Sequence, residues 1–238
     1  MLVLHNVNTY YGGSHVLQDV SMEVKEKEFV VLLGRNGAGK TTTLKSIMGI
    51  QRPREGTIRF LGEDTVKLRP YEIARKGISL VPEDRCIIPN LSLFENLKLA
   101  MLSHIKKEDR DRSLEEVIGY LPWLKERLQQ RGDTLSGGEQ QMLAIARGVI
   151  TNPRLLMVDE PTEGVAPILV VQIGNILKTL SQKGVAILLV EQNYEMSLDI
   201  VLEERAYIIE KGNIRISGTP EELRTRQTEV ESYLGVKI

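Results

Sequence analysis

Residues 34–42 combine three glycines, one lysine and two threonines in a single short stretch. Glycines let the backbone curl so that several N–H groups point toward one centre, and a helix that begins there adds the positive end of its dipole. In such a cradle Lys40 can reach the β- and γ-phosphates of a nucleotide, and the hydroxyl of Thr41 can ligate Mg²⁺. The stretch predicts a nucleotide site, with an ordinary glycine turn as the alternative interpretation. The predicted contact residues are Gly34, Arg35, Asn36, Gly37, Ala38, Gly39, Lys40, Thr41 and Thr42.

Two carboxylates, Asp159 and Glu160, follow the apolar run 155–158. A nucleotide-hydrolysing enzyme of this kind needs a carboxylate opposite its lysine to hold the shell of Mg²⁺, and Asp159 fits that requirement. A second carboxylate aimed at the γ-phosphate, here Glu160, can position and deprotonate water. Acidic residues are common in loops after strands, so the pair gains its meaning from the glycine loop upstream.

A third motif, Ser136-Gly137-Gly138-Glu139, stands at the start of a predicted helix that ends near Ile150. A serine, exposed N–H groups on glycines and a helix N-terminus together form a second anion site. One nucleotide does not need two such sites in one subunit. We therefore infer that Ser136, Gly137, Gly138 and Glu139 of one chain meet the γ-phosphate held by Lys40 of another, with a simple helix cap as the alternative.

The elements that must position these motifs follow from the hydrophobic pattern. The run Phe29–Leu33 is wholly apolar, as in a central parallel strand, and residues 43–50 place Leu44, Ile47 and Met48 at helical spacing. Strand, glycine loop and helix form the context in which the glycine pattern binds phosphate.

The rest of the chain predicts one α/β domain over residues 1–238, with a P-loop NTPase core around a mixed central sheet. Strands at 2–9, 17–24 and 56–60 favour a small antiparallel β subdomain, and the helical run from 91 to 150 favours a helical subdomain inserted at about 84–150. The mixed-charge run 106–112 is interpreted as a solvated connection. Further predicted elements are strands at 78–81, 155–158 and 185–190, helices at 93–102, 113–121, 123–128, 138–150 and 167–182, a hairpin at 205–210 and 213–218, and a last helix opened by Thr219.

Composition is that of a globular protein, with 42% hydrophobic and 26% charged residues and a net charge of −1. This balance argues against a nucleic-acid surface held by bulk electrostatics. The single cysteine, Cys86, cannot form an internal disulfide, which fits a reducing compartment. No leader pattern or long apolar segment is evident, so a cytoplasmic protein is expected.

The chain resembles an ATP-binding cassette (ABC) transporter ATPase subunit over nearly its whole length. The resemblance makes residues 34–41 the Walker A loop, 135–139 the signature motif and 155–159 the Walker B strand, with Glu160 as the base. It also implies that Tyr11 stacks on adenine, although on spacing alone an aromatic residue there is ordinary core or edge packing.

Three positions depart from the common family pattern. Glu83 replaces the Q-loop glutamine, Gln192 replaces the switch histidine and Ala166 replaces the D-loop aspartate. The combination resembles one of the two ATPase subunits of importers for branched-chain amino acids, and of the related urea and amide importers. We expect Gln192 to orient the γ-phosphate and the attacking water, and Glu83 to approach the water shell of Mg²⁺ when ATP is present.

The resemblance implies an ATPase that binds ATP and Mg²⁺ and powers a separate transmembrane permease through ATP-driven dimerisation. Its implied partners are the permease, a second ABC ATPase subunit of the same or another kind and, indirectly, a solute-binding protein, but no nucleic acid; it would sit on the inner face of the cell membrane. The alternatives are a non-transport ABC protein, which typically carries two cassettes or a long coiled-coil insertion, and an unrelated P-loop kinase or GTPase, which the motif at 135–139 disfavours.

Overall fold

The computed structural model describes residues 1–238 except 103, 195–196, 198–204 and 236–238. Its first part is a four-stranded antiparallel sheet in the order β2-β1-β4-β5. Leu2 of β1 lies opposite both Val24 and Phe60, and these side chains are fully buried. The predicted antiparallel pairing of the first two strands is confirmed. The strands are β1 Leu2–Tyr11, β2 Ser14–Val24, β4 Glu55–Phe60 and β5 Glu63–Asp64.

The second sheet has six strands in the order β10-β9-β3-β8-β7-β6. All neighbours are parallel except the hairpin of β9 and β10, so the predicted mixed central sheet is confirmed. Because β3, β7 and β8 are parallel neighbours, the residues that follow them meet at one edge of the sheet. The strands are β3 Phe29–Leu33, β6 Ile78–Val81, β7 Leu155–Asp159, β8 Ala186–Glu191, β9 Arg205–Glu210 and β10 Asn213–Gly218.

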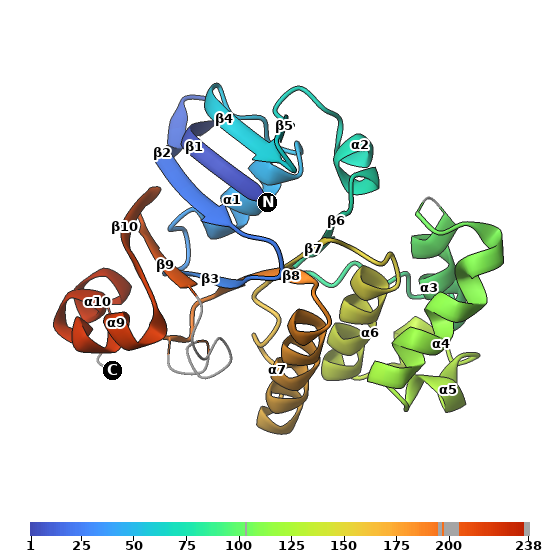
Figure 1. Ribbon diagram of the computed structural model, residues 1–238. Helices are drawn as coiled ribbons and strands as arrows, with labels where there is room; N and C mark the ends of the chain where they lie inside the picture. Colours follow the sequence, from blue (N-terminus) through green and yellow to red (C-terminus); the bar gives the residue numbers. More distant parts are fainter. Residues whose placement is uncertain (103, 195–196, 198–204, 236–238) are drawn as a thin grey trace.

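Strand β3 divides the hydrophobic core, because successive side chains of a strand point to opposite faces. Val30 and Leu32 pack with the first sheet and with helix α1 (Lys40–Ile47), whereas Phe29, Val31 and Leu33 pack with the helices on the other face. Figure 1 shows α1 between the two sheets and α7 (Pro167–Gln182) below the central sheet. The remaining helices outside the segment between β6 and β7 are α2 Pro70–Arg75, α9 Pro220–Thr225 and α10 Gln227–Leu234.

The segment between β6 and β7 is helical and lies at the right of Figure 1. Its last helix, α6, packs on β6 and β7 and also on α3, so it ties the helical segment to the sheet. The extent of an inserted subdomain stays a prediction. The elements are α3 Leu93–Leu102, the 3-10 turn η1 Lys107–Asp109, α4 Arg110–Tyr120, α5 Leu124–Arg127, the 3-10 turn η2 Gly132–Thr134 and α6 Gly137–Val149.

Two local predictions were wrong. The charge run 106–112 is not merely a connection, since η1 covers 107–109 and α4 begins at Arg110. Acidic residues at the start of a helix favour its dipole, and Asp111 occupies that place. The first helix begins at Lys40 rather than Thr43 and ends at Ile47, because Gly49 adopts a φ of 67° that a helix does not continue through.

None of the helices in the described ranges combines the length and apolarity that a membrane crossing requires.

Candidate nucleotide-binding site

The glycine loop between β3 and α1 is held in a curled form by backbone contacts. Gly39 has a φ of 114°, and a Cβ on Gly34 would lie 2.6 Å from the carbonyl oxygen of Ile209. Both positions therefore require glycine. The N–H of Gly34 donates to the carbonyl of Glu191 at 3.3 Å, which fastens the start of the loop to the end of β8.

Lys40 lies folded back on this loop with only 4% of its surface exposed. Its Nζ donates to the carbonyl oxygens of Gly34 at 2.7 Å and Arg35 at 3.0 Å, and it forms an ion pair with Glu160 Oε1 at 3.0 Å. Glu160 is only 8% exposed. A buried ion pair is sensitive to any third charge, because little water screens it. The predicted lysine and the predicted base therefore lie in direct contact.

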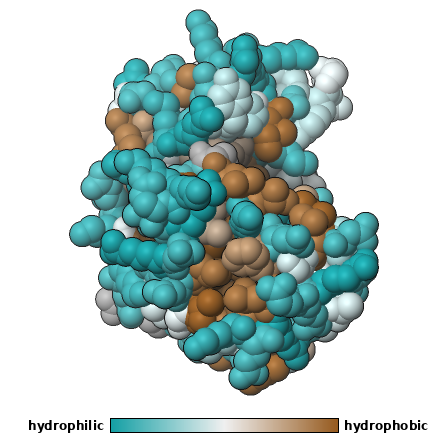
Figure 2. All heavy atoms as spheres, turned by 90° about the vertical axis from the view of Figure 1, so that its right-hand side faces the viewer, coloured by the Kyte–Doolittle hydropathy of each residue, from teal (hydrophilic) through white to brown (hydrophobic). Residues whose placement is uncertain are grey.

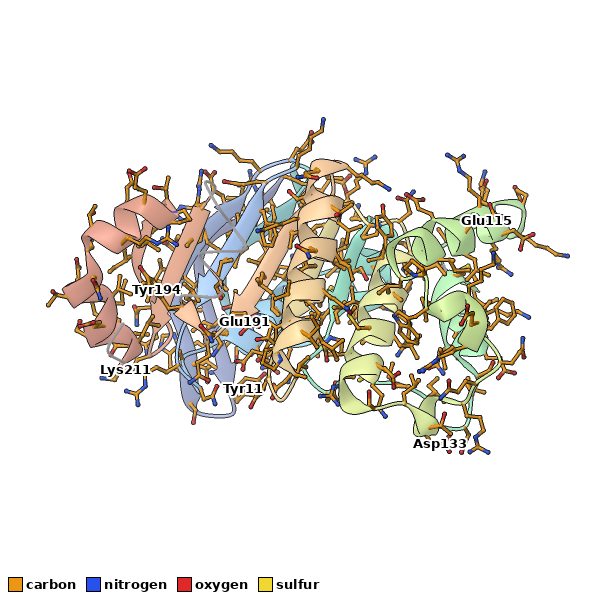
Figure 3. All side chains as sticks on the ribbon, turned by 90° about the horizontal axis from the view of Figure 1, so that it is seen from below. Tyr11, Glu115, Asp133, Glu191, Tyr194 and Lys211 are labelled. Atoms are coloured by element: carbon orange, nitrogen blue, oxygen red, sulfur yellow. The ribbon has the colours of Figure 1, made fainter. Side chains whose placement is uncertain are left out.

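A cavity of about 400 Å³ opens over the loop and the start of α1. It brings together most of the predicted contact residues with Glu83 and Glu160. Tyr11 lines it with 42% of its surface exposed, so a face of the ring is open to a ligand (Figure 3). The lining residues are Tyr11, Val16, Asn36, Gly37, Gly39, Lys40, Thr41, Thr42, Glu83, Glu160 and Glu163.

Two other cavities in the described part of the chain lack this chemistry. One of about 90 Å³ lies between α4 and the end of α7, and one of about 630 Å³ lies beside the end of α2 and residues 104–105. Neither is lined by a predicted site residue, so the cavity over the glycine loop is the candidate site although it is not the largest.

The Thr41 and Asp159 side chains are joined by a hydrogen bond beside Lys40. Asp159 is 2% exposed, and its buried Oδ1 has no hydrogen-bond partner within the described residues. Burial, together with the negative charges of Glu160 and Glu83, raises the pKa of Asp159 to about 6. A hydroxyl and an unpartnered carboxylate oxygen are hard ligands of the kind that Mg²⁺ prefers, so these residues fit the predicted metal.

Gln192 does not line the cavity. It directly follows β8 and its side chain is exposed, while its backbone N–H donates to Glu191 Oε2 at 3.1 Å. The structure therefore places the backbone of Gln192 beside the site, but among the described residues no hydrogen bond joins its side chain to Lys40 or Glu160. The orienting role of Gln192 stays a prediction.

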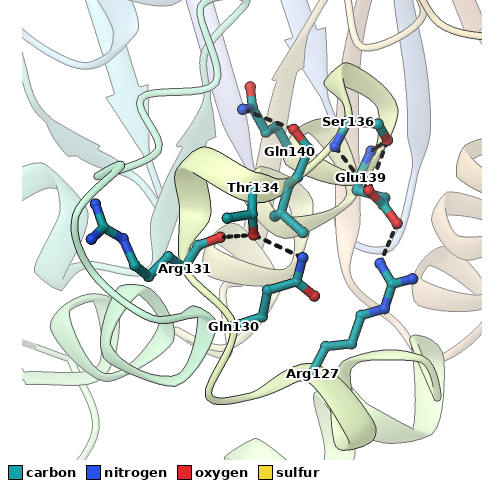
Figure 4. Close-up of polar contacts among 8 residues, drawn as sticks. Arg127, Gln130, Arg131, Thr134, Ser136, Glu139 and Gln140 are labelled. Carbon is teal, nitrogen blue, oxygen red and sulfur yellow. Dashed lines mark hydrogen bonds and ion pairs between the residues drawn. The ribbon is translucent and has the colours of Figure 1, made fainter.

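The predicted signature residues form a self-contained helix start (Figure 4). Ser136 caps α6 and accepts from the N–H of Glu139, while Glu139 Oε2 accepts from the N–H and hydroxyl of Ser136, each at 2.8 Å. Arg127 forms an ion pair with Glu139, and the Ser136 hydrogen bonds lower the pKa of Glu139. A Cβ on Gly138 would lie 2.1 Å from Leu169 Cδ1, so a larger residue there would require the Leu169 side chain to move. None of the four residues lines the cavity.

Two acidic residues near the site were not predicted from the sequence. Glu163 lines the cavity, and its pKa is raised by a hydrogen bond to Glu160 and by the negative charge of that residue. Glu191 is buried at the end of β8 beside the residues that follow β7. The one sequence signal for Glu191 is that it directly follows an apolar run. The same signal identified Asp159.

A parallel sheet with a glycine loop after one strand (β3) and acidic residues after the next strand but one (β7) defines a P-loop nucleotide-hydrolysing protein. The chain belongs to the ABC transporter family, whose model matches residues 17–163. It is accordingly an ATPase of that family.

The chain is similar over its full length to proteins of known transport systems. It is 43% identical to the high-affinity branched-chain amino acid transport ATP-binding protein BraG of Pseudomonas aeruginosa, covering 99% of this chain and 100% of BraG. It is 36% identical to the lipopolysaccharide export system ATP-binding protein LptB of Escherichia coli K12, covering 98% of this chain and 97% of LptB. A dimeric ATP-binding cassette in a post-hydrolysis state, bound to ADP and Pi, matches with a TM-score of 0.82 at 27% identity, covering 92% of this chain and 99% of that one.

Proposed function

We propose that this chain binds and hydrolyses ATP to drive an ABC importer for branched-chain amino acids. The observation that carries the proposal is the contact of Lys40 with Glu160 in a cavity that Thr41 also lines. The solute class is supported by the full-length similarity to BraG. The similarity to LptB, at 36% identity, favours an export system as the alternative.

In the proposed mechanism, the triphosphate draws Lys40 away from Glu160, because it carries more negative charge than a single carboxylate and its oxygens accept charge-assisted hydrogen bonds from the lysine. Thr41 and Asp159 would hold Mg²⁺, which neutralises charge on the β- and γ-phosphates. The released Glu160 carboxylate then takes a proton from a water molecule. The water oxygen bonds to the γ-phosphorus while the bond from that phosphorus to the leaving oxygen of ADP breaks.

The proposed site is completed by a second cassette. The N-terminus of α6, with Ser136 and Gly138, lies outside the cavity of its own chain and presents N–H groups suited to an anion. The γ-phosphate held by Lys40 of one chain would be the anion that binds at the start of α6 in the partner chain. The dimeric relative bound to ADP and Pi supports such an arrangement. The second cassette would be a copy of this chain or a companion ATPase subunit.

Docking to a permease is supported by one apolar face of the molecule. Figure 2 shows apolar side chains gathered on the side that carries the helical segment. Exposed apolar residues on elements of that side include Tyr71 of α2 and Leu99 and Leu102 of α3. Exposed apolar groups that gather on one face mark interaction sites. Association with a permease would place this chain on the inner face of the cell membrane.

The proposal is tested with the variant Glu160→Gln, which keeps the shape of the base but cannot accept the proton. In a strain whose own copy is replaced, this variant should abolish uptake of labelled leucine, and the tagged variant in Mg²⁺-ATP should copurify with a polytopic permease from membranes. The matched control is Glu210→Gln, whose side chain pairs with Arg215 and should leave uptake unchanged. Normal leucine uptake with Glu160→Gln, or fractionation of the chain with ribosomes or DNA, would contradict the proposal.

A further inference from the structure

Glu191 is a buried acid that the mechanism above does not use. It is the last residue of β8, and only 2% of it is exposed. Across the ranges that the structure describes, no lysine, arginine or histidine forms an ion pair with it. A carboxylate at this depth is costly unless its neighbours donate hydrogen bonds to it. Glu191 therefore depends on the donors that surround it.

Those donors come from two segments that follow different strands. Glu191 Oε1 accepts from the hydroxyl of Thr162 at 2.7 Å and from its N–H at 3.3 Å, and Oε2 accepts from the N–H of Gln192 at 3.1 Å. An ionised carboxylate only accepts, whereas a glutamine has one accepting oxygen and a donating NH₂ group. The convergence of three donors thus specifies glutamate over its amide.

The main chain at the end of β8 holds two further parts of the site. The carbonyl of Glu191 accepts from the N–H of Gly34 at 3.3 Å, and the carbonyl of Val190 accepts from the N–H of Glu160 at 2.9 Å. The end of β8 therefore contacts the glycine loop, the proposed base, Thr162 after the base, and Gln192.

Glu160 itself has a strained backbone. Its φ of 43° lies in the left-handed region that side chains other than glycine rarely adopt. Such a strained conformation persists only where several contacts of the surrounding structure hold it in place. On one side the N–H of Glu160 is held by Val190, and two residues further along Thr162 is held by the Glu191 carboxylate.

We propose that Glu191 is a positioning residue for ATP hydrolysis, which acts by fastening Thr162 and Gln192 to one carboxylate so that Glu160 and Gln192 keep a fixed spacing toward the γ-phosphate. Both carboxylate oxygens are occupied by protein donors, so Glu191 is not itself a base for water. The inference rests on the proposed function, since it requires hydrolysis at the site of Lys40 and Glu160.

The test compares Glu191→Gln and Thr162→Val with Glu210→Gln in the transporter purified through a tag on this chain. Glu210 also ends a strand of the central sheet, but its partners are the surface cations Lys211 and Arg215.

Glu191→Gln should lower kcat for ATP about tenfold or more, with KM changed less than about twofold. This is the pattern expected when an interaction that stabilises the transition state is lost. The thermal unfolding midpoint should change little, because the lower cost of burying an amide offsets the hydrogen bond lost at the N–H of Gln192. Thr162→Val should lower kcat in the same direction, and adding it to Glu191→Gln should change little further, because the two residues form one contact.

Each outcome decides the inference. A parental kcat in Glu191→Gln would overturn it, as would a loss of kcat that follows a matching loss of thermal stability and ATP affinity. The variant Glu160→Gln, purified in the same transporter, distinguishes failure of the proposed function from failure of the role of Glu191. Normal hydrolysis by Glu160→Gln would overturn the proposed function and this inference with it, whereas an inactive Glu160→Gln beside a fully active Glu191→Gln would overturn the inference alone.

Discussion

The lysine end of the site (Lys40, Glu160 and Asp159) and the serine end (Ser136–Glu139) satisfy their polar groups in different ways. At the lysine end the charges are buried, and Asp159 keeps a buried oxygen without a partner among the described residues. At the serine end, Ser136 and Glu139 satisfy each other, and Arg127 pairs with Glu139 at the surface. A ligand would thus rearrange the lysine end, whereas the serine end is preformed, with Ser136 and Gly137 exposed at the start of α6.

The difference indicates which interactions each end supplies. Buried charges interact strongly, because the surrounding dielectric is low, so the lysine end should dominate affinity for ATP. An exposed helix N-terminus interacts more weakly with an anion until a second molecule excludes water from it. The serine end should therefore affect the joining of two chains rather than the first binding of ATP.

The largest expected effect is on binding. Lys40→Ala should remove most ATP affinity, because the triphosphate loses its cationic partner in a buried site. Ser136→Arg should bind ATP with near-parental affinity, since Ser136 does not line the cavity. Titration of each isolated variant with labelled ATP compares the two ends. Unchanged affinity in Lys40→Ala would show that the glycine loop is not the phosphate site.

The next effect concerns hydrolysis without loss of binding. Gln192→Ala should slow ATP hydrolysis strongly, because Gln192 is proposed to orient the γ-phosphate and the attacking water and directly follows the strand that fastens Glu160. ATP affinity should stay nearly unchanged, because the Gln192 side chain lies outside the cavity. Gln192→His, which also supplies an N–H donor, should retain hydrolysis. Steady-state rates of the assembled transporter measure both variants. A parental rate in Gln192→Ala would make Gln192 a spectator.

A third effect follows from the raised pKa of Asp159. A carboxyl group whose pKa in the folded state rises from 3.8 to about 6 contributes stability below its unfolded pKa and loses it as pH rises through the folded value. The shift corresponds to about 3 kcal/mol in the metal-free protein. Asp159→Asn should raise the unfolding midpoint without Mg²⁺ at about pH 7.5, and this gain should shrink toward about pH 4. A gain that does not depend on pH would refute this explanation of the pKa.

The smallest expected effect is that of the adenine contact. Tyr11→Ala should weaken ATP binding by about 1–3 kcal/mol, the usual contribution of a base stacked on an aromatic ring. Tyr11→Phe should bind as the parental chain does. Tyr10 is the matched neighbour, and it is already stacked on His15 with ring centroids 4.1 Å apart, while Arg54 covers the ring at 4.5 Å. Equal ATP affinity in Tyr11→Ala and the parental chain would reassign Tyr11 to surface packing.

Local patterns predicted most of the fold. Helix α7 matches its predicted bounds because Pro167 favours a first helical turn and Gly184, with a φ of 92°, lies just past its end. Strand β3 was predicted because an entirely apolar run suits a strand buried on both faces. The start of α4 was missed because a mixed-charge run has no apolar periodicity of its own, although its residues are good helix formers.

The site was predicted in part. Asp159 and Glu160 were found because they directly follow an apolar strand, and Lys40 because it ends a glycine loop. The hydrogen bonds of Glu191 to Thr162 join residues 29 positions apart, and no spacing rule predicts such a contact. The exposure of the Gln192 side chain was equally hidden, since it depends on the path that the chain takes after β8.

The central claim is that two chains share each nucleotide. It is tested most directly by the mass of Glu160→Gln in solution, measured by light scattering with Mg²⁺-ATP or Mg²⁺-ADP, alone and mixed with its companion cassette. The account predicts a two-cassette assembly in Mg²⁺-ATP only, and its loss when Ser136→Arg is added to Glu160→Gln although ATP still binds. A single cassette in saturating Mg²⁺-ATP, both alone and with the companion, or an assembly that survives Ser136→Arg, would contradict it.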